Sequence, residues 1–541
     1  IGSVAWSPSG KWLSFSMAPG GGMNQQIYII RPDGSEIRLL TDGGNETNRL
    51  GNWTSDGRKL MMSSNRRLST AMDAYLVDME NMKLELISKS KGIGSFSDIT
   101  TDGKYAILNR LESRGSNDLF LIETQTGQEK IVTDHKGPGT FFGQFSSSER
   151  EIYVGFNKNR NLVAFGKIKI TKKGKPGPIE ILVERSDAEL ENFKLNNDAT
   201  LAALIWNVSG RNELTFFDLQ KNQVIKNTIS LPSEIVRGID FSKNGKWIAV
   251  ELSGATTPRD IWILNTETYQ FRQLTFSPHA GVDLKTLIAP RLVHFSAHDG
   301  LKLTGWLYHS QSSYEPGPIV LSFHGGPEGQ ERPRFRSDYQ ALLAQGVSIL
   351  APNVRGSSGF GKKFVNLDNG ELRFNGIKDI KSCVEYVISS GIANPQRIGI
   401  MGGSYGGYMV LAGLAYYPDL ISVGANLFGV VNFETFFANT EPWMAAISTI
   451  EYGDPVTQKD LLKSLSPIHM VDQVRAPTIV LHGANDTNVP VVEAEQVVEN
   501  LKKRGVPVEY ILFPDEGHGF RKTINRIRST SSIVNWFVKY L

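Results

Sequence analysis

The sequence contains a single cysteine, Cys383, among 541 residues. A disulfide framework and a cysteine-ligated zinc site each need at least two thiols, so both are excluded. Long apolar runs are missing as well. The most apolar stretch, residues 413–433, is interrupted by Pro418 and Asp419, whereas a membrane-spanning helix needs about 20 consecutive apolar residues. We therefore expect no spanning helix and no membrane partner.

An excess of charge of either sign is also absent. The chain has 58 lysines and arginines against 55 acidic residues, a formal net charge of +3, and no run of five basic residues. This balance predicts no nucleic-acid partner. No H-E-x-x-H spacing and no G-x-x-x-x-G-K-[ST] loop occurs, so we expect no metal and no cofactor. The chain begins at Ile1, so a leader could have preceded it, and a cytoplasmic or an exported (periplasmic or secreted) location stays open.

The first half contains an internal repeat. A turn of small polar residues followed by a short apolar strand occurs six times, at intervals of 46 to 50 residues. About 46 residues accommodate four short strands, the size of one propeller blade, whereas β-helix and leucine-rich repeats are shorter. Because ring closure commonly uses strands from both ends, we predict a β-propeller of six or seven blades over residues 1–278. The fourth residues of the six turns are Gly10, Gly57, Gly103, Glu149, Ala199 and Gly245.

The second half, residues 279–541, shows a different pattern. A hairpin at 292–308 is followed by unbroken runs of valine, isoleucine and leucine, such as 319–323, 397–401 and 478–482, which alternate with helical segments. Strands that are apolar along their whole length and separated by helices are typical of a parallel sheet covered on both faces. This half is predicted to be a doubly wound, mostly parallel α/β domain.

A serine stands at the end of one of these strands. The sequence Gly402-Gly-Ser-Tyr-Gly-Gly follows the strand at 397–401 and leads directly into a helix. A G-x-S-x-G match is weak evidence by itself, and a glycine-rich turn holding a solvated serine is the simpler interpretation. However, strand, glycine-rich turn and helix in this order form the nucleophile elbow of α/β-hydrolases. Ser404 is therefore the candidate nucleophile.

A serine nucleophile needs a base and a carboxylate that orients the base. Asp486 lies on a loop after the strand at 478–482, and His518 lies between two glycines on a loop after the next strand. The chain order Ser404, Asp486, His518 is that of α/β-hydrolases. Asp515 is the nearest alternative acid.

Acyl transfer also needs hydrogen-bond donors for the oxyanion. One is expected from the backbone N–H of Tyr405, the residue after the nucleophile. The other is expected from the backbone N–H of Gly326 in the loop His324-Gly-Gly-Pro, which has the form of an oxyanion loop. Both donors are backbone groups, so they do not depend on a side chain.

A repeat-built propeller followed by this α/β-hydrolase domain resembles the prolyl oligopeptidase family of serine peptidases over nearly the whole chain. The His-Gly-Gly-Pro form is most similar to the acylaminoacyl-peptidase branch. The propeller, however, has no adjacent Glu-Glu pair of the kind that the dipeptidyl peptidase IV branch uses for a free amine. The similar motifs are Gly402-Gly-Ser-Tyr-Gly-Gly-Tyr408, His324-Gly-Gly-Pro, Pro352-Asn-Val-Arg-Gly-Ser-Ser-Gly-Phe-Gly361, His482-Gly-Ala-Asn-Asp-Thr-Asn-Val-Pro490 and Gly517-His-Gly-Phe.

The resemblance implies a propeller that caps the active site, so that short peptides enter and folded proteins are excluded. It also implies that Tyr405, Val489 and an aromatic residue, Phe433 or its neighbours Phe436 and Phe437, line the pocket for the side chain before the scissile bond. The spacing of these phenylalanines fits a core helix equally well.

We therefore predict a serine peptidase of short peptides, of the acylaminoacyl-peptidase or oligopeptidase type, that works through an acyl-enzyme. Two alternatives stay open. The first is an esterase or amidase of small acyl substrates with the same triad, and the second is a propeller interaction module attached to an inactive hydrolase domain. A homo-oligomer is also left open.

Overall fold

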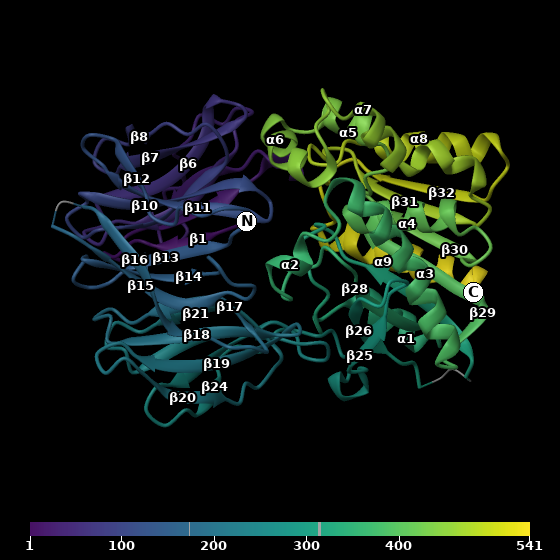
Figure 1. The fold of residues 1–541 in the computed structure, drawn as a ribbon, viewed down its shortest axis with the longest axis horizontal. Coiled ribbons are helices and arrows are strands. Elements are labelled where there is room, and N and C mark those ends of the chain that lie inside the picture. Colours follow the sequence, from purple (N-terminus) through teal and green to yellow (C-terminus); the bar gives the residue numbers. More distant parts are fainter. Residues whose placement is uncertain (173, 312–314) are drawn as a thin grey trace.

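The computed structural model describes residues 1–172, 174–311 and 315–541. Figure 1 shows two lobes that face each other: one built of strands, coloured purple to teal, and one of strands and helices, coloured mainly green to yellow. In the described residues, no helix is both long and apolar enough to cross a membrane.

The first lobe is a six-bladed β-propeller. Each blade is an antiparallel sheet of four strands that are consecutive in the chain. The first three blades are β1–β4 (Val4–Trp6, Leu13–Met17, Gln26–Ile30, Arg38–Leu39), β5–β8 (Asn48–Trp53, Lys59–Leu68, Ala71–Asp78, Leu84–Ser88) and β9–β12 (Gly94–Ile99, Tyr105–Ser113, Ser116–Glu123, Gln128–Ile131). The last three are β13–β16 (Phe141–Phe145, Glu151–Phe156, Ala164–Ile170, Pro176–Val183), β17–β20 (Glu189–Leu195, Leu201–Val208, Arg211–Asp218, Gln223–Ile229) and β21–β24 (Ile235–Phe241, Trp247–Ser253, Asp260–Asn265, Phe271–Gln273).

The propeller prediction is confirmed, with the smaller of the two blade numbers. Among the described residues no blade combines strands from the two ends of the domain, which was the reason for allowing a seventh. The repeated turn places its fourth residue at positive φ in every blade. Gly103 has a φ of 69°, and the two non-glycine residues, Glu149 and Ala199, have φ of 57° and 46°. Glycine adopts this conformation without steric cost, which explains why four of the six turns use it.

The second lobe is an α/β-hydrolase domain around one eight-stranded sheet. The strand order is β25-β26-β28-β27-β29-β30-β31-β32. The strands from β28 to β32 in this order pair in parallel, and β25 and β26 form an antiparallel edge hairpin that joins the sheet at β28. The strands are β25 (Arg291–Ser296), β26 (Lys302–Tyr308), β27 (Gly317–Phe323), β28 (Ser348–Asn353), β29 (Ala393–Gly403), β30 (Val423–Leu427), β31 (Thr478–Gly483) and β32 (Val508–Phe513).

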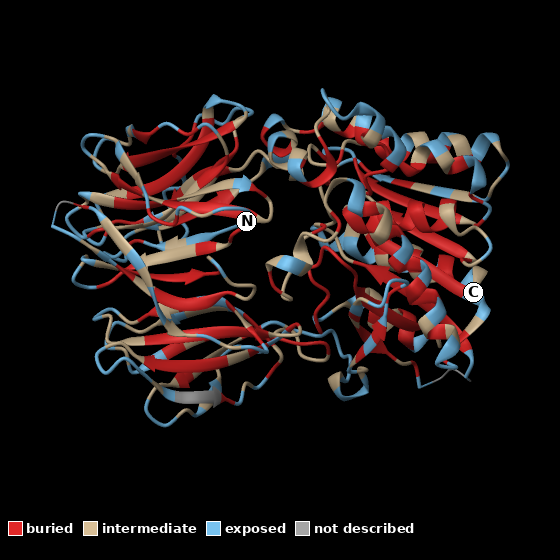
Figure 2. Cartoon of the chain, viewed as in Figure 1, coloured by how far each residue is buried: buried red, intermediate tan, exposed pale blue. Residues whose placement is uncertain are grey.

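Helices cover both faces of this sheet. Buried side chains of α1 and α9 form one apolar cluster with one face, and those of α3, α4 and α8 form a second cluster with the other face. Figure 2 shows the strands as a buried layer between helices that are exposed on their outer sides. The α-helices are α1 (Ser337–Ala344), α2 (Lys362–Val365), α3 (Arg373–Ser389), α4 (Tyr405–Tyr416), α5 (Phe433–Asn439), α6 (Pro442–Tyr452), α7 (Lys459–Leu465), α8 (Val492–Lys503) and α9 (Thr523–Tyr540), with 3-10 turns at Pro19–Gly21, Leu284–Thr286, Gly370–Leu372 and Pro467–Gln473.

The two lobes are joined by a buried polar contact. Arg332, on the loop between β27 and α1, donates from Nε to the carbonyl oxygen of Gly210 at 2.8 Å and from Nη2 to Asn212 at 2.9 Å. Its Nη1 forms an ion pair with Glu191 of the fifth blade at 2.7 Å. Three bonds from one guanidinium fix the propeller to the loop that precedes α1.

Candidate active site

Ser404 occupies the sharp turn between β29 and α4. Its φ is 59° and its ψ −120°, a conformation that serine adopts only in a constrained turn. Glycines make the turn possible: a Cβ on Gly402 would lie 2.5 Å from the backbone of Gly406, and a Cβ on Gly406 would lie 2.2 Å from the carbonyl oxygen of Phe323. The hydroxyl is therefore held at the N-terminus of α4, where the helix dipole favours negative charge.

Asp486 and His518 lie on neighbouring loops and contact each other. His518 Nδ1 is 2.7 Å from Asp486 Oδ2, and the Asp486 side chain is fully buried. The other oxygen, Oδ1, accepts the backbone N–H groups of Asn488 and Val489, both at 2.9 Å. A carboxylate held in this way accepts a hydrogen bond from Nδ1–H of the imidazole. Nε2 is then the nitrogen that takes part in proton transfer.

The alternative acid, Asp515, does not contact His518. Its carboxylate is exposed, forms an ion pair with Lys522 and accepts a bond from Asn525 at 3.0 Å. The geometry therefore pairs the histidine with Asp486.

Phe428 connects the Asp486–His518 pair to the elbow. Its ring packs edge-on against the imidazole of His518, with ring centroids 4.9 Å apart. A Cβ on Gly403, the residue before the serine, would lie 2.9 Å from the same ring. The backbone N–H of Ser404 donates to the carbonyl oxygen of Leu427 at 3.0 Å. The serine and the histidine are thus neighbours of one aromatic side chain.

A second histidine supports the acid loop. His482 has no exposed side-chain surface, and its Nε2 lies 2.8 Å from the carbonyl oxygen of Val489 and 3.5 Å from Asp486 Oδ2. Burial lowers the pKa of His482, so the ring is neutral at physiological pH. This ring positions the loop that carries Asp486.

The loop after β27 packs against the elbow. A Cβ on Gly325 would lie 3.2 Å from Ser404 Cβ, so the glycine backbone lies beside the serine. His324 is fixed within this loop: its Nδ1 is 2.9 Å from the carbonyl oxygen of Gly325 and its Nε2 is 2.8 Å from Ser357 Oγ. Burial lowers the pKa of His324 to about 4, which keeps the ring neutral. Gly326 follows, with a φ of 130° that favours glycine.

Tyr405 is anchored by a buried charged network. Its hydroxyl donates to Asp368 at 3.2 Å, and Asp368 forms an ion pair with Arg373 at 3.0 Å. Arg373 also pairs with Glu451 of α6 at 2.6 Å. Burial raises the pKa of Asp368 to about 7 and raises the pKa of Tyr405 as well. The network fixes the first residue of α4, whose N–H lies next to Ser404.

Among the residues predicted to line a substrate pocket, Phe433 and Val489 are both buried. Phe433 begins α5, and its ring packs between Tyr408 and Tyr452, with ring centroids at 5.4 Å and 4.6 Å. Val489 is buried beside Asp486. Their role in substrate binding stays a prediction.

The propeller contacts two sides of this site. Arg114, in the hairpin between β10 and β11, donates to the carbonyl oxygen of Gly326 at 2.6 Å and to Ser448 of α6 at 2.8 Å. In the first blade, the carbonyl oxygen of Gly20 accepts from Asn485 at 2.9 Å, and a Cβ on Gly21 would lie 3.0 Å from the backbone nitrogen of Gly517. The blades therefore reach both the loop of Gly326 and the loops of Asp486 and His518.

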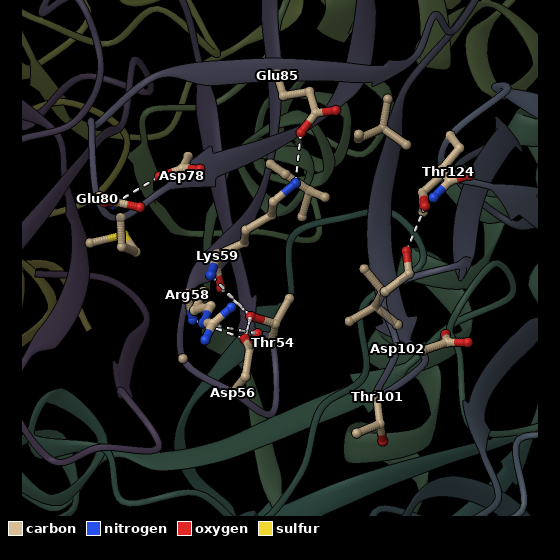
Figure 3. A pocket seen from close by; sticks show the side chains of 17 residues that line it. Thr54, Asp56, Arg58, Lys59, Asp78, Glu80, Glu85, Thr101, Asp102 and Thr124 are labelled. Carbon is tan, nitrogen blue, oxygen red and sulfur yellow. Dashed lines mark hydrogen bonds and ion pairs between the residues drawn. The ribbon is translucent and has the colours of Figure 1, made fainter.

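A cavity of about 380 Å³ opens beside Ser404 in the hydrolase domain. A larger cavity, of about 780 Å³, lies in the propeller between the turns of the second and third blades (Figure 3). Its lining contains two ion pairs, Lys59 with Glu85 at 2.8 Å and Arg58 with Asp56 at 3.8 Å. It contains none of the proposed site residues, so the cavity beside the serine is the candidate active site.

Sequence analysis did not predict Arg114, Phe428 or the Asp368–Arg373–Glu451 network. These residues belong to no short motif, and their contacts arise only when separate segments pack together. One signal was available: the motif at 352–361 contains Ser357, which contacts His324. It also contains Arg355, which forms ion pairs with Asp379 and Asp299.

Known proteins are similar to this chain in sequence and in fold. The sequence pattern of the prolyl oligopeptidase family matches residues 333–541. The chain is 27% identical to dipeptidyl aminopeptidase BIII of Pseudoxanthomonas mexicana, over 97% of this chain and 78% of that protein. It is 31% identical to the acylamino-acid-releasing enzyme of Arabidopsis thaliana, over 43% of this chain and 32% of that enzyme.

A puromycin-hydrolysing peptidase of Mycobacterium tuberculosis has the same fold. The two structures align with a TM-score of 0.86 over 98% of this chain and 84% of the other, at 16% identity. Both lobes are included in an alignment of this length. These matches identify residues 333–541 as a serine peptidase domain of the prolyl oligopeptidase family, and the propeller and α/β-hydrolase sheet give the whole chain the fold of such structures.

Proposed function

We propose that this chain hydrolyses short peptides, with Ser404 as nucleophile, His518 as base and Asp486 as the carboxylate that orients the base. The observation that carries the proposal is the 2.7 Å bond between His518 Nδ1 and Asp486 beside a serine held at a φ of 59° in its elbow. A histidine oriented by a buried carboxylate and a serine exposed in an elbow are the components from which a catalytic triad is built.

In the proposed reaction, Ser404 Oγ attacks the carbonyl carbon of the scissile bond while its proton passes to Nε2 of His518. The negative oxygen of the tetrahedral intermediate accepts hydrogen bonds from the backbone N–H groups of Tyr405 and Gly326. The C–N bond then breaks as the imidazolium protonates the leaving amine. A water molecule, deprotonated by His518, attacks the acyl-enzyme and releases the second product.

The position of the propeller supports an upper limit on the size of the substrate. Arg114 contacts the oxyanion loop, and Gly20 and Gly21 contact the loops beside Asp486 and His518. Contacts on two sides of the site support extended peptides of a few residues, rather than folded proteins, as the substrates. The names of two relatives, dipeptidyl aminopeptidase and acylamino-acid-releasing enzyme, support a peptide substrate here.

The test is a panel of short peptides with a free amino terminus, an acetylated amino terminus, or only an internal cleavage site, with products identified by mass spectrometry. We expect cleavage in at least one class, and loss of all cleavage in Ser404→Ala. Retained cleavage in that folded variant would contradict the proposal. The preferred class distinguishes an aminopeptidase, an acylaminoacyl peptidase and an oligopeptidase.

A further inference from the structure

The cavity beside Ser404 is lined by two arginines, Arg334 and Arg336, from the loop between β27 and α1. The Arg336 guanidinium is neutralised, because it forms two bonds to the carboxylate of Asp338 at 2.9 Å and 2.5 Å. Arg334 is different: among the residues that the structure describes its guanidinium forms no ion pair within 4 Å and donates one hydrogen bond, to the carbonyl oxygen of Gln330 at 3.4 Å. One positive charge in the cavity is therefore available for a ligand.

The positive charge of Arg334 affects the pKa values of neighbouring side chains. Burial is the main cause of the low pKa of His324, and the positive charge of Arg334 lowers it further. On the propeller side, burial and then Arg334 lower the pKa of Arg237 of β21, which forms no ion pair within 4 Å in the described part of the chain. The nearby carboxyl of Glu331 has a pKa raised by burial, against the influence of Arg336 and Arg334, and pairs with neither. Arg237 and Arg334, from opposite lobes, are thus close enough for each charge to act on the other, and neither Glu251 nor Glu331 forms an ion pair with Arg334.

The cavity opens next to Ser404 and is a candidate site for the leaving group of the substrate. Phe428, which contacts the His518 ring, lines it together with Ser404 and Gly325. His518 is the group that protonates the leaving amine, so the part of the substrate after the scissile bond must lie next to it. Neither Phe433 nor Val489, the predicted pocket residues for the side chain before that bond, lines this cavity.

The size of the cavity limits what it can hold. A volume of about 380 Å³ is at the lower end for small-ligand sites and suits one or two amino-acid residues. Arg334 also borders a second cavity of about 470 Å³ between the lobes, so it stands where the leaving segment would end or exit.

We propose that Arg334 binds the C-terminal carboxylate of the leaving peptide, so that the preferred substrates end one or two residues after the scissile bond. The inference rests on the proposed function. An arginine fork matches a carboxylate in two parallel hydrogen bonds, and such charge-assisted bonds are the strong ones. A lysine or an amide in this position would bind a carboxylate less specifically.

The experiment compares two peptides of identical sequence that end two residues after the cleavage site, one with a free C-terminal carboxylate and one with a C-terminal carboxamide. For the wild type we expect kcat/KM to be about tenfold or more higher for the acid. In Arg334→Gln the loss should fall on the acid peptide, so that the acid-to-amide ratio approaches one. Raising the salt concentration should lower the wild-type ratio, since the cavity is open to solvent.

Arg58→Gln is the matched control, because Arg58 is an exposed arginine that lines the propeller cavity, which contains none of the proposed site residues. It should keep the wild-type ratio. An equal loss on both peptides in Arg334→Gln, or a wild-type ratio near one, would overturn the inference. Failure of the proposed function looks different, because then neither peptide is cleaved and Ser404→Ala changes nothing.

Discussion

The propeller and the hydrolase domain bury their apolar residues in different ways. In the propeller the core is divided into five small clusters, each shared by neighbouring blades. In the hydrolase domain two large clusters lie on the two faces of one sheet, and Met72 and Ile93 of the propeller join one of them. A divided core tolerates local changes blade by blade, whereas a continuous one transmits them to the loops that carry Ser404, Asp486 and His518.

The largest effect is expected in the hydrolase domain, from Asp486→Asn. An amide in this position no longer fixes the Nδ1 proton of His518, and kcat should fall by about 10⁴-fold with little loss of stability. Steady-state kinetics and circular dichroism measure both. Asp515→Asn is the control, since Asp515 contacts Lys522 rather than His518. A larger loss in the control than in Asp486→Asn would reverse the assignment of the acid.

A second prediction concerns the junction of the two lobes. Arg332→Met removes three bonds to the propeller and leaves Glu191 without its ion-pair partner. We expect the free energy of unfolding to fall by about 2 kcal/mol, measured by urea denaturation. Adding Glu191→Gln should recover part of this loss. No recovery in the double variant would show that the ion pair adds nothing to the junction.

A third prediction uses the buried carboxyl of Glu493 on α8. It accepts the N–H groups of Val431 and Asn432 at 2.9 Å and 2.8 Å, and burial raises its pKa to about 7. The folded state therefore holds a proton that the unfolded state has lost, and stability falls as the pH rises from about 4.5 to 7, by about 1–3 kcal/mol. Glu493→Gln should flatten this dependence in urea titrations, whereas Glu499→Gln, at an exposed position of the same helix, should keep it.

The smallest effect is expected in the propeller turns. Ala199 has a φ of 46°, and Ala199→Gly should stabilise the protein by about 0.5 kcal/mol, because relief of the left-handed strain exceeds the entropy lost by glycine. Gly103→Ala is the inverse control: nothing lies within 4 Å of an added Cβ, so only the backbone strain is introduced. Thermal unfolding should show opposite shifts, and shifts of the same sign would contradict this explanation.

The fold and the candidate catalytic residues could be predicted because each depends on local sequence. The 46-residue interval reflects one blade, and the loops of Ser404, Asp486 and His518 each follow an apolar strand of the same parallel sheet. Strand β30 was not predicted, since its sequence Val-Gly-Ala-Asn-Leu contains three residues of low strand propensity. Phe428, which follows it, was missed for the same reason.

Contacts between the lobes could not be predicted from the sequence. Arg114 is separated from Gly326 by 212 residues, and Arg332 from Asn212 by 120 residues. Neither arginine belongs to a motif, and a polar residue in a loop is usually solvated. Arg334 is functionally informative only because the structure shows both the cavity that it lines and the absence of an ion-pair partner among the described residues.

The most direct test of the catalytic assignment is covalent labelling by a serine-reactive phosphonate, followed by peptide mapping. Ser404 should carry the label at close to one equivalent per chain, and labelling should be lost in Ser404→Ala and slowed in His518→Ala, because the imidazole activates the hydroxyl. A label on a different serine, or peptidase activity that survives without any label on Ser404, would contradict the account.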